Sequence, residues 1–283
     1  MNYVNSDSII STAKLAEQLR APDVRIVDGT NQFPDPDLNP REEYAKGHIP
    51  DAVFFDIGEI ADTQSPYPNM LPSPEKFTSR VSALGLGDGC RIVVYDAAGL
   101  ISAARVWWMF RFFGHKDVAV LDGGLPKWIR EGRAINDTHV TPDRRHFTAR
   151  INNLLVRDSD QMLANIDRRD EQIVDTRSTE RFHGKVMESR PGLRTGHIPG
   201  SINLPYPDVL DPREKTLLPA GELQRKFAEA GIDLKKPIVT SCGSGVTAGV
   251  VTLGLHLLGL EDVSVYDGSW SEWGSRNDLP IAT

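Results

Sequence analysis

The chain has 283 residues, a net charge of −7 and a sequence pI near 5.5, with 40% hydrophobic and 25% charged residues, as in a globular protein of one or two domains. The acidic balance argues against binding to nucleic acid or to an anionic membrane, because both need a basic face. Two cysteines, no apolar run of membrane-spanning length and no basic, apolar leader make the cytoplasm the expected compartment.

The first half of the chain is repeated in the second half. Four segments recur in the same order with a nearly constant offset: 25–30 with 172–177, 47–56 with 196–205, 91–99 with 237–245, and 117–128 with 262–273. Such a long period predicts a duplicated domain. The polar stretch 136–159 lacks helical or strand periodicity, so we expect a first domain at 1–137, a linker at 138–158 and a second domain at 159–283.

Each half alternates short apolar runs with amphipathic segments. The runs IVD, IVVY and VAVLD have no polar alternation, which is typical of parallel strands buried on both faces. Helices are predicted at 73–85, 101–114, 219–231 and 246–259, the first with Ser73 as its cap, Pro74 at its first position and Gly85 at its end. The expected fold class is therefore α/β, with two tandem domains that each hold a parallel sheet flanked by helices.

A loop of small residues, SCGSGVT at 241–247, carries one of the two cysteines between a predicted strand and a predicted helix. Ligands of open α/β sheets gather at the carboxyl ends of strands. Unpaired N–H groups and the helix dipole favour an anion there, so a nucleophilic sulfur is expected at Cys242. Gly243 and Gly245 let the backbone turn its amides inward, and Ser244 and Thr247 add hydroxyl groups.

Cys242 and its loop have three other interpretations. A cysteine can be a small buried hydrophobic residue, which is what we expect of Cys90. A cysteine phosphatase needs an arginine six residues after the nucleophile, where this chain has Ala248. A metal site is disfavoured because the loop has no second cysteine and no histidine, so no metal is expected.

At SCGSGVT, at the two GHIP segments, and at ESRPGLRTGHIPGSINLP and YDGSWSEWGSRNDLP, the chain resembles the tandem-domain rhodanese-type sulfurtransferases, most closely those that use 3-mercaptopyruvate. The resemblance implies two rhodanese-like domains, of which the first has lost its cysteine, since Asp96 stands at the position that matches Cys242. It also implies no cofactor and an acceptor thiol such as thioredoxin, or cyanide in an assay.

The resemblance assigns a role to several residues. Cys242 matches the nucleophile that forms a persulfide, and Arg181 and Arg190 match arginines that hold the substrate carboxylate. The residues expected to hold the transferred sulfur are Gly243, Gly245, Val246 and Thr247.

A catalytic Ser–His–Asp arrangement would consist of Ser244, His48 and Asp37, with the serine in the second domain and the other two in the first. Because GHIP recurs at 196–199, His48 can equally be a structural element of the fold. The family motif GLYSAPR reads GLISAAR here, with Ile101 and Ala104 as the departures, and Arg105 is retained on either a cleft-facing or an exposed position.

Two further functions stay open from the sequence. Thiosulfate-preferring relatives carry cations in the loop, typically as CRKGVT, whereas this loop has none, which favours the monoanion 3-mercaptopyruvate over the dianion thiosulfate. A protein that carries a persulfide without turnover is the non-enzymatic alternative.

Overall fold

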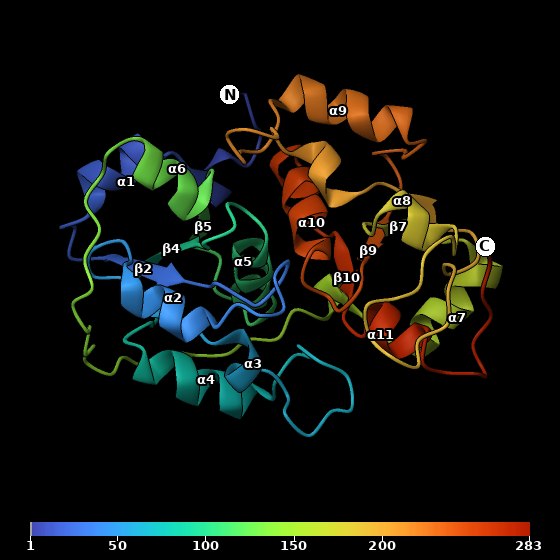
Figure 1. The fold of residues 1–283 in the computed structure, drawn as a ribbon, viewed down its shortest axis with the longest axis horizontal. Coiled ribbons are helices and arrows are strands. Elements are labelled where there is room, and N and C mark those ends of the chain that lie inside the picture. Colours follow the sequence, from blue (N-terminus) through green and yellow to red (C-terminus); the bar gives the residue numbers. More distant parts are fainter. Residues whose placement is uncertain (1) are drawn as a thin grey trace.

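In a computed structural model, which describes residues 2–283, the chain forms two α/β domains, each built on a five-stranded parallel sheet (Figure 1). The first sheet has the order β1-β5-β4-β2-β3, and the second has the matching order β6-β10-β9-β7-β8. The strands are β1 (Ile9–Ile10), β2 (Val24–Asp28), β3 (Val53–Phe54), β4 (Arg91–Tyr95), β5 (Val118–Leu121), β6 (Val156–Arg157), β7 (Gln172–Asp175), β8 (Ile202–Asn203), β9 (Ile238–Ser241) and β10 (Ser264–Tyr266). The predicted duplication and fold class are confirmed.

Helices lie on both faces of each sheet (Figure 1). In the first domain they are η1 (Ser6–Ser8), α1 (Thr12–Gln18), α2 (Pro40–Lys46), α3 (Ile57–Ile60), α4 (Pro74–Ala83), α5 (Ser102–Phe112) and α6 (Gly124–Arg130). In the second they are η2 (Asn153–Leu155), α7 (Ser159–Arg168), α8 (Thr179–Phe182), η3 (Tyr206–Val209), α9 (Ala220–Glu229), α10 (Ala248–Leu257) and α11 (Ser269–Trp273).

The four helices predicted from the sequence are confirmed as α4, α5, α9 and α10. The side chain of Ser73 accepts a hydrogen bond from the Lys76 amide at the start of α4, Pro74 is the first helical residue, and Gly85 follows the helix with φ +69°. These local signals act within one turn of the helix, which is why the sequence alone reveals them.

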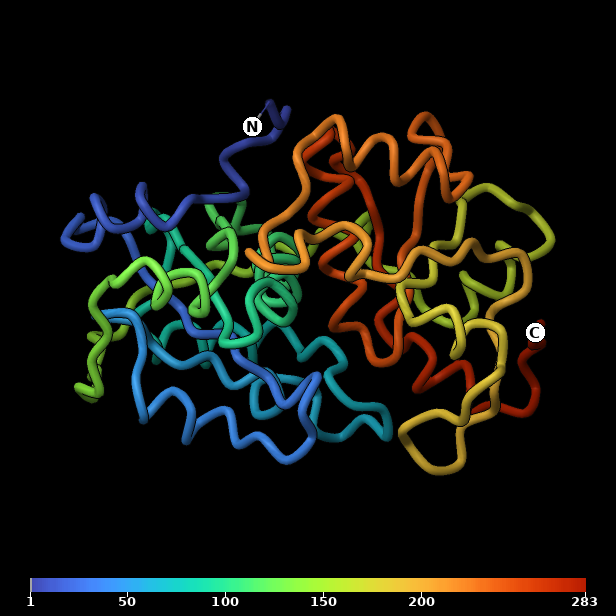
Figure 2. The backbone as a smooth tube through the Cα atoms, turned by 45° about the horizontal axis from the view of Figure 1, so that its top comes forward, coloured from blue at the N-terminus to red at the C-terminus, as the bar shows by residue number. Residues whose placement is uncertain are grey.

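The two domains meet through α5 and α10, which lie next to each other between the sheets (Figures 1 and 2). One hydrophobic cluster runs through both helices and into both domains, and Trp107 and Trp108 pack within it. The backbones approach closely at Gly249, where a Cβ atom would lie 2.9 Å from both the Ala104 carbonyl carbon and the Arg105 amide nitrogen. Only glycine allows this approach.

The connection between the domains is shorter than expected. Residues 137–152 form no helix or strand, but β6 pairs in parallel with β10 and so belongs to the second sheet. The last residues of the expected linker, 138–158, are therefore part of the second domain, because a two-residue strand leaves no periodic signal in the sequence. Among residues 2–283, no helix is long and apolar enough to cross a membrane.

Candidate active site

Cys242 lies directly after β9, at the carboxyl end of the second sheet, and is only 2% exposed. Its amide donates to the Ser269 hydroxyl at 3.2 Å, and its carbonyl accepts from the Trp270 amide at 3.0 Å. The Ser269 hydroxyl also lies 4.0 Å from the Cys242 sulfur. The loop before α10 and the start of α11 together fix the thiol.

The first domain shows what the equivalent loop binds when the thiol is absent. One Asp96 carboxylate oxygen accepts from the amides of Ala98 and Gly99 at 2.9 and 2.8 Å. The other accepts from Ile101 and Ala103 at 2.7 and 2.8 Å. The loop of the first domain therefore forms an anion cradle that its own aspartate fills.

The same cradle is open in the second domain. By position, the amides that match those of Ala98, Gly99 and Ile101 belong to Ser244, Gly245 and Thr247. None of these three amides has an acceptor within residues 2–283. An anionic sulfur on Cys242 would therefore find three of the four donors that the Asp96 carboxylate uses in the first domain, since the fourth counterpart, the Gly249 amide, bonds the Val246 carbonyl at 3.2 Å.

Ser269 adopts a backbone conformation that is unusual for its residue type. Its φ is +50°, and the matching residue of the first domain is Gly124, with φ +54°. A residue with a Cβ atom pays roughly 1 kcal/mol for the left-handed region. The serine hydroxyl, which contacts both the amide and the sulfur of Cys242, is the feature that the glycine would lack.

Arg181 and Arg190 both lie beside the cysteine loop. The guanidinium of Arg181 lies 3.2 Å from the point where a Cβ atom on Gly243 would stand, and Arg190 donates to the Ser271 hydroxyl. Partial burial lowers the pKa of Arg190, and the charges of Cys242 and Arg181 then shift it in opposite directions, which places the three groups near one another. The structure thus brings both predicted arginines to the predicted nucleophile.

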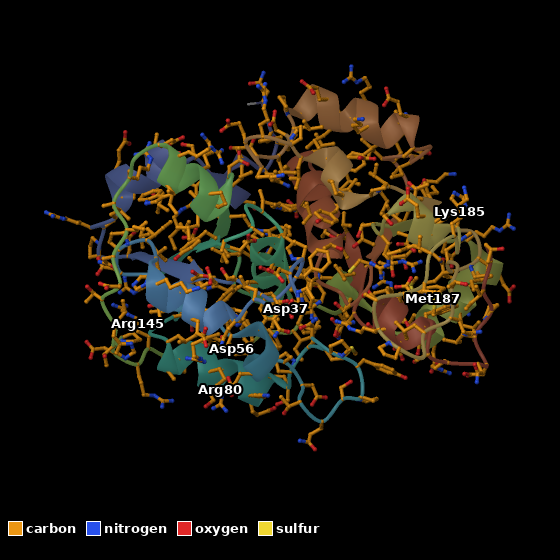
Figure 3. The ribbon with its side chains drawn as sticks, in the orientation of Figure 1. Asp37, Asp56, Arg80, Arg145, Lys185 and Met187 are labelled. Atoms are coloured by element: carbon orange, nitrogen blue, oxygen red, sulfur yellow. The ribbon has the colours of Figure 1, made fainter. Side chains whose placement is uncertain are left out.

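A buried charge network behind these arginines was not foreseen from the sequence. Glu188 accepts from Arg177 at 2.7 Å and from Arg181 Nε at 3.0 Å, and Arg177 also pairs with Asp175. Burial would lower the pKa of Arg177, but the charges of Asp175 and Glu188 raise it above its ordinary value. Met187, labelled in Figure 3 on the second domain, is 88% exposed, whereas its neighbour Glu188 is buried. Residues 185–187 are all exposed, so no pattern in this segment marks Glu188 as buried.

The charges around the site do not cancel. Three arginines at 177, 181 and 190 face two carboxylates at 175 and 188, which leaves one net positive charge. Such a site matches a ligand with a single negative charge.

The structure does not bring Ser244, His48 and Asp37 together. Within residues 2–283, the Ser244 hydroxyl is bonded only to Asn69 Nδ2, at 3.2 Å. His48 is fully buried, with its ring nitrogens 2.9 and 3.2 Å from the carbonyls of Tyr44 and Thr138. Asp37 is exposed on the first domain (Figure 3).

The second GHIP histidine has similar surroundings to the first, although its ring is only partly buried. His197 lies 2.9 Å from the Phe182 carbonyl and stacks on the Phe182 ring, as His48 stacks on Tyr44. The structural interpretation of His48 therefore has support that the catalytic interpretation lacks.

The remaining predicted residues lie in or behind the loop. Gly245 has φ +75° and packs against Asp267 and Arg105, Val246 is buried, and the Thr247 hydroxyl lies 3.3 Å from that of Thr176. Cys90 is a buried free thiol. Across residues 2–283, no three His, Cys, Asp or Glu side chains are grouped as metal ligands.

Comparison with known proteins gives consistent matches over both domains. The family model described as Rhodanese-like domain matches residues 11–131 and 158–276. The 3-mercaptopyruvate sulfurtransferase of Escherichia coli K12 is 44% identical over 94% of this chain and 95% of its own length. The mitochondrial thiosulfate/3-mercaptopyruvate sulfurtransferase 1 of Arabidopsis thaliana is 43% identical over 98% of this chain and 78% of its own length. The crystal structure of the 3-mercaptopyruvate sulfotransferase SseA from Escherichia coli superposes with a TM-score of 0.85 at 40% identity, covering 93% of this chain and 98% of the other.

Proposed function

We infer that this chain, which belongs to the rhodanese-like family as a tandem-domain sulfurtransferase, moves sulfur from 3-mercaptopyruvate to a thiol or cyanide acceptor and releases pyruvate. The Cys242 thiolate attacks the substrate sulfur, so a sulfur–sulfur bond forms as the carbon–sulfur bond breaks. The electron pair goes to the enolate of pyruvate, and the proton of the substrate thiol completes its methyl group. The terminal sulfur of the persulfide then passes to the acceptor, which restores the thiolate.

The observation that carries this proposal is the pairing of an open anion cradle with one net positive charge. The loop amides of Ser244, Gly245 and Thr247 hold the persulfide sulfur. Arg181 and Arg190 hold the substrate carboxylate beside it, because a guanidinium is planar and permanently charged.

Thiosulfate is the second candidate donor, because the Arabidopsis relative is named for both substrates. A dianion gains from cations next to the nucleophile, and the loop from Gly243 to Thr247 supplies none. We therefore expect the ratio kcat/KM to be higher for 3-mercaptopyruvate than for thiosulfate.

The experiment measures cyanide-dependent thiocyanate formation with both donors and pyruvate release with 3-mercaptopyruvate, and follows the mass of the Cys242 peptide. The wild-type protein is expected to gain one sulfur atom on Cys242, and Cys242→Ser is expected to release no pyruvate. Arg181→Gln should raise the KM for 3-mercaptopyruvate by on the order of tenfold or more, since a charge-assisted bond to the substrate is lost. Pyruvate release by Cys242→Ser, or an equal or higher efficiency with thiosulfate, would contradict the proposal. A persulfide without turnover would identify a carrier instead.

A thiol protein such as thioredoxin is the proposed acceptor, and the cytoplasm is the proposed compartment because both cysteines are free. Oxidation of a purified thioredoxin coupled to pyruvate release tests the first point.

A further inference from the structure

Three successive carbonyl groups of the cysteine loop are bound from outside the loop. The Gly243 carbonyl accepts from the amide and hydroxyl of Ser271 at 2.9 and 2.7 Å, and the Gly245 carbonyl accepts from Arg105 Nη1 at 3.2 Å. The Ser244 carbonyl lies 3.5 Å from Asn69 Nδ2. In a planar trans peptide, the carbonyl and the following N–H point in opposite directions. These contacts therefore turn the amides of residues 244–246 away from their anchors.

Arg105 reaches this loop from the other domain. It lies on α5, has no exposed surface, and stacks on Trp108 with its guanidinium carbon 4.4 Å from the ring centre. Its Nη2 lies 2.7 Å from Asp267 Oδ1 as an ion pair and also donates to the Asn69 carbonyl. A buried ion pair is weak evidence for stability, because desolvation offsets much of its attraction. The position of Arg105 is therefore better explained by the group that it orients, the Gly245 carbonyl.

The duplication supplies an internal comparison. Asp267 accepts from the Leu71 amide at 2.7 Å, and its counterpart Asp122 accepts from the Leu217 amide at 2.9 Å, so this interdomain contact exists twice. The arginine exists only once, since the first turn of α10 carries the buried valines 250 and 251.

The Ser271 anchor is also confined to the cysteine side. The Leu125 amide bonds the Asp96 carbonyl as the Trp270 amide bonds the Cys242 carbonyl, so the counterpart of Ser271 is the next residue, Pro126. Proline has no N–H to donate. The residues that bind the loop carbonyls are therefore found only beside the loop that has the cysteine. The aspartate–leucine contact, in contrast, is found on both sides of the domain interface.

We propose that Arg105 is a positioning residue for sulfur transfer: the catalytically silent domain uses it to hold the Gly245 carbonyl out of the cradle, so that this carbonyl does not face the sulfur of Cys242. This rests on the proposed function of Cys242. Without Arg105 the peptide between Gly245 and Val246 is free to turn its carbonyl inward, where its dipole opposes a thiolate. Arg105 has no role in holding the substrate carboxylate, which is bound by other residues.

The test compares Arg105→Met, Arg105→Lys and the double variant Arg105→Met/Asp267→Asn, which leaves no unpaired buried charge. We expect kcat for 3-mercaptopyruvate to fall on the order of 10- to 100-fold with KM within about threefold, as for loss of a preorganised donor. Alkylation of Cys242 by iodoacetamide, followed by mass spectrometry, should need a pH roughly one unit higher, and the lysine variant should recover part of both effects.

Asp122→Asn is the matched control, because it alters the same interdomain contact on the side without a cysteine; it should keep kcat and the alkylation profile. Thermal unfolding identifies which variants are folded, and the double variant serves where the single one is not. A folded Arg105 variant with unchanged kcat and alkylation profile would overturn the proposal, as would a rise in KM alone. If Cys242→Ser releases pyruvate, the nucleophile assignment fails instead, so the two failures are distinguishable.

Discussion

Removal of the Asp96 carboxylate is expected to destabilise the first domain strongly. The side chain has no exposed surface and accepts four backbone hydrogen bonds between 2.7 and 2.9 Å. Asp96→Ala leaves four amides at the start of α5 without their acceptor. Asp96 therefore has a structural role of its own at the position where the other domain has its thiol.

The size of the effect follows from the four bonds. A hydrogen bond to a charged group contributes roughly 1.5–3 kcal/mol, which gives an upper bound of about 6–12 kcal/mol if all four added fully. A cavity of about 500 Å³, lined by Ala97, Ala98, Leu100 and Ile101 among others, borders the loop and admits water to some of the freed amides. We therefore expect a loss of about 3–5 kcal/mol.

Calorimetry and urea unfolding measure this loss, with Trp107, Trp108 and Trp128 reporting on the first domain. The expected loss corresponds to a fall in the melting temperature on the order of 10 °C. Asp96→Asn should cost a similar amount, because its NH₂ group would face two N–H donors. Asp88→Ala is the control, since within residues 2–283 this exposed carboxylate of the same domain bonds only Thr148. A loss below about 1 kcal/mol for Asp96→Ala would refute the anion-cradle reasoning.

Three further predictions concern stability. Burial raises the pKa of Asp122 from 3.8 to about 6, although the Leu217 amide and Lys127 act in the opposite direction. The folded state therefore binds this proton more tightly than the unfolded state does. The stability that the protonated group contributes is lost as the pH rises from 4 through 6. Asp122→Asn should therefore gain about 1–2 kcal/mol at pH 7.5 relative to pH 5 in thermal unfolding, and an equal change at both pH values would contradict the assignment. Gly249→Ala should lower the free energy of unfolding by about 1–3 kcal/mol, because the new Cβ atom would meet the backbone of α5. Gly254→Ala in the same helix, whose Cβ atom would have no neighbour closer than 3.6 Å, should be neutral or stabilising. Equal effects of the two substitutions would argue against close helix packing. His48→Asn should lower the melting temperature at least as much as His197→Asn, because His48 is the more buried of the two, and should leave kcat within twofold. A selective loss of kcat for His48→Asn would restore its catalytic role.

The features that the sequence predicted are those encoded by neighbouring residues. The cap at Ser73, the buried strands and the loop around Cys242 each depend on a few consecutive positions, and the repeat of whole segments exposed the duplication. Arg181 and Arg190 were found by resemblance and lie at the site.

The features that escaped the sequence depend on tertiary contacts. Glu188 joins two arginines that are 7 and 11 positions away along the chain, and Arg105 meets Asp267 across more than half of the chain. No local pattern marks such pairs. The uncertainty about His48 had the same cause, because its carbonyl partners include Thr138, which is 90 residues away.

The reciprocal contacts of Asp267 with Leu71 and of Asp122 with Leu217 have the form of an isologous interface, in which each half offers the other the same pair of surfaces. The chain is thus arranged as a twofold dimer whose subunits have been joined end to end. In a true homodimer, any substitution appears on both sides of the axis at once. Covalent linkage removes that constraint, so the two halves can differ. The first half has the Asp96 carboxylate, bound by amides of its own loop, in place of a thiol, and it also has Arg105. The second half keeps the reactive sulfur of Cys242, whose loop Arg105 contacts.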